Sequence, residues 1–119
     1  MELSDLILKS HRNAYNKCFW EDEECVIEKM VASNLFGQKD INVARQAFMA
    51  QKLMLIASEL GEALEALRKG DAINFREELA DVIIRMADMA GGYDIDLETE
   101  IKEKMQKNKA RPKKHGKEF

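Results

Sequence analysis

Residues 53–71 of the chain read LMLIASELGEALEALRKGD, and they predict most of its architecture. Apolar side chains recur here every three or four residues, the spacing of one face of an α-helix. The same face extends back to Met49, so we expect one long helix over about residues 42–69. Gly70 and Asp71 are typical turn residues and should end it.

A second amphipathic helix is predicted after this turn. Asn74 is a suitable N-cap with Glu77 three residues on, and the apolar residues that follow keep helical spacing as far as Ala90. Gly91 and Gly92 should end this helix. Because the connection is short, the two helices are expected to form an antiparallel hairpin.

Shorter helices are predicted on both sides of the hairpin. One should span about residues 4–18, and a second, beginning near Cys25, should end by Gly37. A last helix should start with Asp96 as its cap and fray near Arg111, which precedes a proline. The fold class expected is therefore all-α, an antiparallel helix hairpin with flanking helices.

The composition sets limits on the class of protein. A chain of 119 residues has the size of one domain, and 45% hydrophobic with 34% charged residues fits neither a disordered chain nor a membrane-embedded one. No apolar run approaches the roughly 20 residues of a membrane span, and residues 1–10 lack the pattern of a secretory signal. We therefore expect a cytoplasmic protein in which Cys18 and Cys25 are reduced, small core residues.

Charge is distributed unevenly along the chain. Residues 1–101 hold 11 basic and 20 acidic side chains, whereas residues 102–119 hold 8 basic and 2 acidic ones. The basic tail is either a solvated end or a source of positive charge for an anion held by the acidic body. It lacks the interleaved aromatics of a nucleic-acid stacking surface, so no nucleic-acid partner is expected.

Two acid pairs occupy matching places on the hairpin. Glu59 and Glu62 flank a core leucine on the first helix, and Glu78 and Asp81 flank a core leucine on the second with the same offsets. In an antiparallel hairpin these edges can face each other, and Glu62 and Asp81 lie at similar heights, about 10 Å from the turn. The four carboxylates can therefore converge.

Converging carboxylates repel one another unless protons or cations compensate their charge. Oxygen ligands without His or Cys suit Mg²⁺ or Mn²⁺. A di-iron site would need Glu-x-x-His motifs, and the two histidines, His11 and His115, are far from the acid pairs in the sequence. The alternative is a solvated acidic edge whose charges pair with Lys52, Arg85 and the basic tail.

Two further residues lie beside the first acid pair. Gly61 costs about 1 kcal/mol relative to alanine in a helix, which indicates either a tight helix contact or room for a ligand. Lys52 lies two turns before Glu59 and can hold a carboxylate or meet a phosphate.

Lys104, Asn108 and Arg111 share one face of the last predicted helix, with the spacing i, i+4 and i+7. Two cations and an amide on one face can bind phosphates. A solvated basic helix would have the same pattern, so both interpretations stay open.

The order of these motifs resembles the MazG-like nucleoside triphosphate pyrophosphohydrolases of the all-α NTP pyrophosphatase superfamily. The resemblance covers about residues 43–112. The motifs that carry the resemblance are Glu59-x-x-Glu62, Glu78-x-x-Asp81, Asp96-Leu97, Lys104-Met105, Asn108 and Arg111-Pro112.

We expect a single domain over residues 1–119, with N-terminal helices in residues 1–42, whose role the resemblance does not assign, and a basic tail in residues 113–119.

The resemblance implies helical homodimers or homotetramers with four-helix-bundle cores completed between subunits. It implies hydrolysis of a nucleoside triphosphate to the monophosphate and pyrophosphate with Mg²⁺. Mn²⁺, which prefers the same oxygen ligands, is the expected substitute. The resemblance also implies that the metal ligands are Glu59, Glu62, Glu78 and Asp81, and that Lys104, Asn108 and Arg111 lie near substrate phosphates. Lys52 joins the substrate-binding residues through its position.

Glu59 is the expected general base, because it lies near the core edge, where a drier setting and a raised pKa suit that role. The predicted function is Mg²⁺-dependent hydrolysis of a (deoxy)nucleoside triphosphate in nucleotide-pool house-cleaning. The alternative is a non-catalytic helical oligomerisation or interaction module with an acidic edge and a basic tail. The expected partners are the nucleotide and further copies of the chain, without a membrane; the base and the choice between dimer and tetramer stay open.

Overall fold

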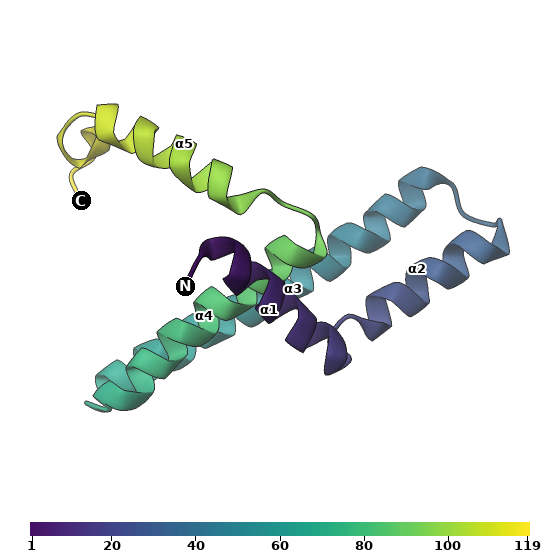
Figure 1. The fold of residues 1–119 in the computed structure, drawn as a ribbon, viewed down its shortest axis with the longest axis horizontal. Helices are drawn as coiled ribbons and strands as arrows, with labels where there is room; N and C mark the ends of the chain where they lie inside the picture. Colours follow the sequence, from purple (N-terminus) through teal and green to yellow (C-terminus); the bar gives the residue numbers. More distant parts are fainter.

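The computed structural model describes residues 1–119 and contains five α-helices and no strand, so the all-α prediction is confirmed. The two longest helices are α3 (Gln38–Arg68) and α4 (Ala72–Gly92), and they form the predicted antiparallel hairpin (Figure 1). The others are α1 (Leu3–Asn16), α2 (Glu21–Ser33) and α5 (Leu97–Ala110), followed by a short 3₁₀ turn, η1 (Lys113–Gly116).

The turn of the hairpin follows from its local sequence. Gly70 has a positive φ of 73°, a conformation that glycine adopts without strain. The carboxylate of Asp71 then accepts a 3.1 Å hydrogen bond from the backbone N–H of Asn74 and caps α4. The prediction that Asn74 is the cap is therefore wrong by three residues, because Asp71 satisfies the free amide first.

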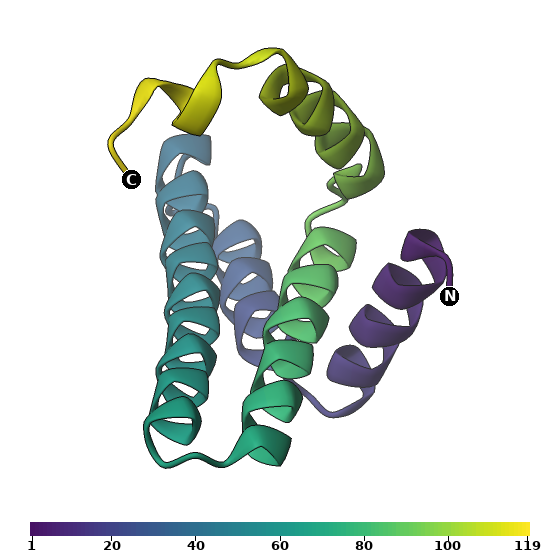
Figure 2. The same ribbon diagram turned by 90° about the vertical axis from the view of Figure 1, so that its left-hand side faces the viewer.

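The flanking helices cover different parts of the hairpin. Helix α1 packs against α4, and α2 packs against α3 (Figure 2). Gly91 and Gly92 lie within the last turn of α4, where a Cβ on Gly92 would collide with the ring of Trp20 and one on Gly91 would lie 2.8 Å from the Cβ of His11. These two glycines therefore lie at the end of α4, as predicted, and also allow α1 and the α1–α2 link to pack closely against it.

The single chain leaves much of its apolar surface uncovered. Its radius of gyration is 17.8 Å, against about 13.5 Å for a compact domain of this length. Only 11 of 119 residues are buried, which is too few for a complete core. The leucines expected on the buried face of α3 are instead exposed in the single chain: Leu53, Leu60, Leu64 and Leu67.

The prediction that both cysteines are core residues is wrong, and one of the two interpretations of Gly61 is excluded. Cys18 and Cys25 are exposed, because Cys18 lies in the α1–α2 link and Cys25 faces away from the helix that α2 packs on. Around Gly61, no atom lies within 4 Å of the position that a Cβ would occupy, so of the two interpretations of this glycine, a tight contact with a helix of the same chain is excluded and open space remains.

Helix α5 projects from the end of α4 and is separated from the hairpin in both views (Figures 1 and 2). Asp96 caps it as predicted, accepting hydrogen bonds from the backbone N–H and the hydroxyl of Thr99 at 3.2 and 2.8 Å. Residues 98–119 are all exposed. The chain contains no helix with both the length and the apolar character needed to cross a bilayer.

Candidate metal centre and adjoining cleft

Three of the four predicted acids meet across the hairpin. One oxygen each of Glu59 on α3 and of Glu78 and Asp81 on α4 lie within 4.8 Å of one another. Glu59 and Glu78 are half-buried and Asp81 is exposed. We call these three residues the carboxylate trio; they meet because helical spacing places all of them on the facing edges of the two helices.

Glu62, the fourth predicted acid, is exposed and lies outside the trio. It follows Glu59 by about one turn of α3 and still interacts with Glu78, whose pKa it helps to raise. The structure therefore brings three of the predicted acids together and leaves the fourth at the rim.

The electrostatics of the trio separate two carboxyl groups that the sequence treats alike. The hydrogen bond with Glu59, together with burial, raises the pKa of Glu78 to about 7. The pKa of Glu59 is lowered by that same hydrogen bond and by the guanidinium of Arg85. The raised pKa was expected at Glu59 and instead belongs to Glu78, because the hydrogen bond with Glu78 and then the neighbouring arginine stabilise the ionised form of Glu59.

One oxygen of the trio lacks a partner. The Oε2 atom of Glu78 is buried and accepts no hydrogen bond, a situation that is uncommon for a buried polar atom. The ligand atoms that the trio offers are all carboxylate oxygens, the ligands preferred by Mg²⁺ and Mn²⁺. The chemistry of the trio thus fits a hard divalent cation.

Of the two cations considered in the sequence, Arg85 and Lys52, only Arg85 lies at the trio. The Nε of Arg85 donates a 2.9 Å hydrogen bond to Oε1 of Glu59. Lys52, predicted to meet substrate, instead has its Nζ 3.7 Å from Oε2 of Glu23 and 4.1 Å from the ring centroid of Trp20. Arg85 is therefore the cation beside the carboxylates, and Lys52 lies deeper, between an acid and an aromatic ring.

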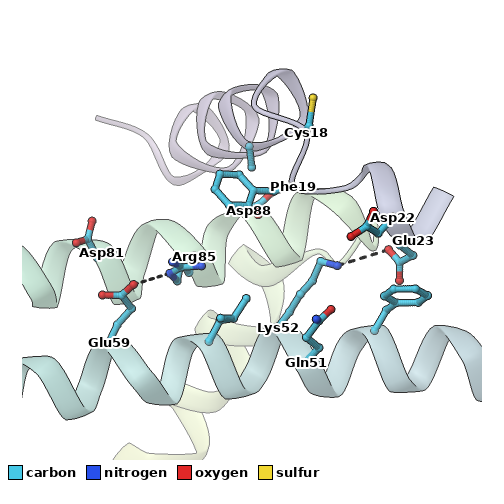
Figure 3. A pocket seen from close by; sticks show the side chains of 13 residues that line it. Cys18, Phe19, Asp22, Glu23, Gln51, Lys52, Glu59, Asp81, Arg85 and Asp88 are labelled. Carbon is cyan, nitrogen blue, oxygen red and sulfur yellow. Dashed lines mark hydrogen bonds and ion pairs between the residues drawn. The ribbon is translucent and has the colours of Figure 1, made fainter. Parts of the chain in front are cut away.

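A cleft of about 410 Å³ begins at the trio and continues along α3 toward α2 (Figure 3). One end is lined by Glu59, Asp81 and Arg85, and the other by side chains of the α1–α2 link, α2 and the first half of α3. The sequence did not assign this second end to a site, because its residues come together only through the packing of α2 on α3. They include Phe19, Asp22, Glu23, Phe48 and Gln51.

A network of polar side chains holds the helices around the cleft. Oδ1 of Asp88 accepts a 2.8 Å hydrogen bond from Nε1 of Trp20 and lies 2.9 Å from Nδ1 of His11. The hydroxyl of Tyr93 donates a 2.8 Å hydrogen bond to Oε1 of Glu23. These contacts fix α1, the link and α2 against the end of α4.

The three residues predicted to bind phosphates stay apart from the trio. Lys104 and Asn108 on α5 and Arg111 just after it are exposed, on the projecting part of the chain. The only side-chain hydrogen bond that any of the three makes joins Nη1 of Arg111 to Nδ1 of His115, at 3.0 Å. A single chain therefore does not place these residues beside its own carboxylates.

Comparison with known families gives one match. The model of the MazG nucleotide pyrophosphohydrolase domain matches residues 49–115, more than half of the chain. The matched range includes the carboxylate trio, Arg85 and α5. No curated protein and no solved structure matches the chain.

Proposed function

The chain belongs to the MazG nucleotide pyrophosphohydrolase family, and from this premise we propose that it hydrolyses a (deoxy)nucleoside triphosphate to the monophosphate and pyrophosphate with Mg²⁺. The observation that carries the proposal is the carboxylate trio, with its unpartnered buried oxygen on Glu78. A cleft large enough for part of a nucleotide opens directly from it. The proposed role is the removal of unwanted nucleotides from the cellular pool.

The proposed metal ligands are Glu59, Glu78 and Asp81, with Glu62 at the rim as the fourth. A bound Mg²⁺ supplies positive charge for phosphate oxygens and lowers the pKa of a coordinated water. Mn²⁺, which accepts the same oxygen ligands, is the proposed substitute. Three carboxylates this close repel one another, and a bound cation would relieve that repulsion. This supports the proposal that the trio binds a metal ion.

Glu59 is the proposed proton acceptor. A lowered pKa makes Glu59 a weaker base than the sequence led us to expect, but Glu59 is ionised at neutral pH, whereas Glu78, with a pKa of about 7, is partly protonated in the metal-free protein. Arg85 lies beside Glu59 and faces the cleft, where its remaining N–H groups can donate to phosphate oxygens. Lys52 is proposed to hold Glu23 and Trp20 in place at the cleft wall. It would contact the substrate from this position beside Glu23 and Trp20.

We also propose that the chain acts as a homodimer or homotetramer. The exposed leucines of α3 form an apolar surface that a second copy would cover, completing a four-helix core. Association would also bring the basic residues 102–119 of one copy to the acidic body of another, and with them Lys104, Asn108 and Arg111.

Pyrophosphate release from a panel of ribo- and deoxyribonucleoside triphosphates, with and without Mg²⁺, tests the proposed function. Asp81→Asn should fold normally and lose at least about 100-fold in kcat, the scale of losing one electrostatic contact in a transition state. Glu62→Gln should also lose activity. Glu77→Gln, which alters an exposed acid on the same helix outside the trio, is the matched control and should retain it.

Absence of Mg²⁺-dependent hydrolysis across the whole panel would favour the alternative, a non-catalytic interaction module. Near wild-type turnover by Asp81→Asn at saturating Mg²⁺ would contradict the ligand assignment while leaving the activity in place.

A further inference from the structure

The cleft extends well beyond the residues needed for phosphate chemistry. Its lining on α3 runs from Glu59 back to Phe48, 11 residues or about 16 Å along the helix axis. The far end lies between the α1–α2 link, α2 and the first half of α3 (Figure 3). A nucleotide with its phosphates at the trio would therefore have its nucleoside directed toward this end.

Aromatic side chains line the far end. Phe19 in the link is 65% exposed although it is large and apolar, and it lines the cleft together with the half-buried Phe48. A flat ligand lying against Phe19 would cover part of this exposed ring. Aromatic rings of this kind stack favourably on any nucleobase, because every base has a π face.

The polar groups at this end are rich in hydrogen-bond acceptors. Glu23 already accepts from Tyr93, and Asp88 is already bonded to Trp20. Asp22, however, makes no hydrogen bond or ion pair to another side chain and lines the cleft.

Gln51 lines the same end and is similarly without a side-chain partner. Its amide can both donate and accept, whereas an ionised Asp22 can only accept. A base that offers an amino group satisfies Asp22, and a neighbouring ring nitrogen can pair with Gln51. A base with oxygen at that position places acceptor against acceptor.

We propose that this end of the cleft binds the nucleobase, stacked on Phe19, and that Asp22 and Gln51 select bases with an exocyclic amino group over uracil and thymine. This inference rests on the proposed nucleotide pyrophosphohydrolase function and adds its base preference. Phe19 supplies affinity for any base, and Asp22 supplies discrimination.

The test compares cytosine with uracil, which carry an amino group and an oxygen, respectively, at the same ring carbon. Equilibrium binding of CMP and UMP to the full chain gives a readout independent of turnover, and kcat/KM for CTP and UTP gives a second one. The wild type should prefer cytosine about 10-fold or more in both, the scale of one charge-assisted hydrogen bond. Asp22→Asn should bring both ratios close to one, and Glu21→Gln, an acid in the same turn outside the cleft, should not.

Phe19→Ala provides an independent arm. It should weaken binding of both nucleotides by about 5- to 150-fold and leave their ratio unchanged. Phe36→Ala, which removes a partly exposed aromatic ring from the α2–α3 link away from the cleft, is its control.

The two readouts separate the inference from the function on which it rests. Hydrolysis of nucleotides with equal affinity for CMP and UMP, unchanged in Asp22→Asn, would overturn the base preference alone. Selective CMP binding without hydrolysis would support the base site and contradict the enzyme. A chain that neither binds nor hydrolyses these nucleotides would overturn both.

Discussion

Arg85 and Glu59 join the two helices of the hairpin through a 2.9 Å hydrogen bond between Nε and Oε1. The arginine follows Asp81 by about one helical turn, so it shares the edge of α4 that carries the trio. After the hydrogen bond with Glu78, Arg85 is the second group that stabilises the ionised form of Glu59 and lowers its pKa. At the same time 36% of its side chain remains exposed, on the cleft side.

Arg85→Gln is expected to weaken handling of the nucleotide. The substitution removes a cation placed between the trio and the rest of the cleft, so KM should rise by about 10- to 150-fold, the range of one charge-assisted hydrogen bond. Arg85→Lys should recover part of this, since it keeps the charge but lacks the planar fork. Steady-state kinetics check this, with Arg76→Gln, at an exposed position near the start of α4, as control. An unchanged KM in Arg85→Gln would exclude Arg85 from substrate binding.

The metal-free protein should lose stability as the pH rises from about 5 to 8. Glu78 has a pKa of about 7 in the folded protein, raised from its ordinary value, so the folded state holds a proton that the unfolded chain releases. That advantage is present at low pH and disappears as the pH passes 7. Glu59, whose pKa is lowered, affects stability in the opposite direction, and its effect changes only at pH values below the ordinary pKa of a glutamate.

Thermal unfolding in the presence of a chelator measures this effect. The melting temperature of the wild type should fall between pH 5 and pH 8, and Glu78→Gln should remove most of the decline, because an amide does not titrate. An identical pH dependence in both proteins would show that another group controls it.

The hairpin and its acids were predictable because both depend on helical periodicity. More than four turns of apolar spacing identify α3, and the same period fixes Glu59, Glu78 and Asp81 on facing edges. The position of the cap was less certain from sequence, because Asp71 and Asn74 are both favourable capping residues and only the path of the turn decides between them.

The far end of the cleft could not be predicted in the same way. It depends on the α1–α2 link, where Cys18 has a positive φ of 67° that its residue type does not suggest. That link places Phe19 at the cleft and Trp20 on Gly92. Helical periodicity likewise identified an apolar face on α3. It could not show that no other helix of the same chain covers this face.

The two helix glycines should respond oppositely to alanine. Gly61→Ala adds a methyl where no atom lies within 4 Å, so it should raise the free energy of unfolding by about 1 kcal/mol through helix propensity. Gly92→Ala collides with Trp20 and should lower it by about 1–3 kcal/mol. Denaturant unfolding measures both, and destabilisation by Gly61→Ala would indicate that another copy packs at that position.

Self-association is expected to depend on the hairpin. Leu64 on α3 and Ile83 on α4 are 57% and 53% exposed in the single chain, so replacing either by arginine should weaken the oligomer with little effect on helix content. Leu35→Arg, at an 82% exposed position in the α2–α3 link, is the control and should leave assembly unchanged. Sedimentation analysis tests this, and a strictly monomeric wild type at micromolar concentration would contradict the proposed assembly.

Lys104 and Arg111, which we call the basic end, should contribute to catalysis in a second copy of the chain. Lys104→Ala and Arg111→Ala should each lower kcat/KM by about 10- to 150-fold, one charge-assisted contact, and leave Mg²⁺ binding and the melting temperature nearly unchanged. Both side chains are exposed, so removing them disturbs no packing. Lys109→Ala, which removes the same charge from the opposite side of α5, is the matched control.

Mixing two inactive variants decides which chain supplies these residues. If each site combines the trio of one copy with the basic end of another, Asp81→Asn and Arg111→Ala should complement each other. Random re-association into dimers would then give half mixed dimers with one intact site each, or about a quarter of wild-type activity. No recovery, in a mixture shown to exchange subunits, would mean that the basic end serves its own chain. Since α5 is separated from its own hairpin, that result would require the helix to swing back onto the trio when the nucleotide binds.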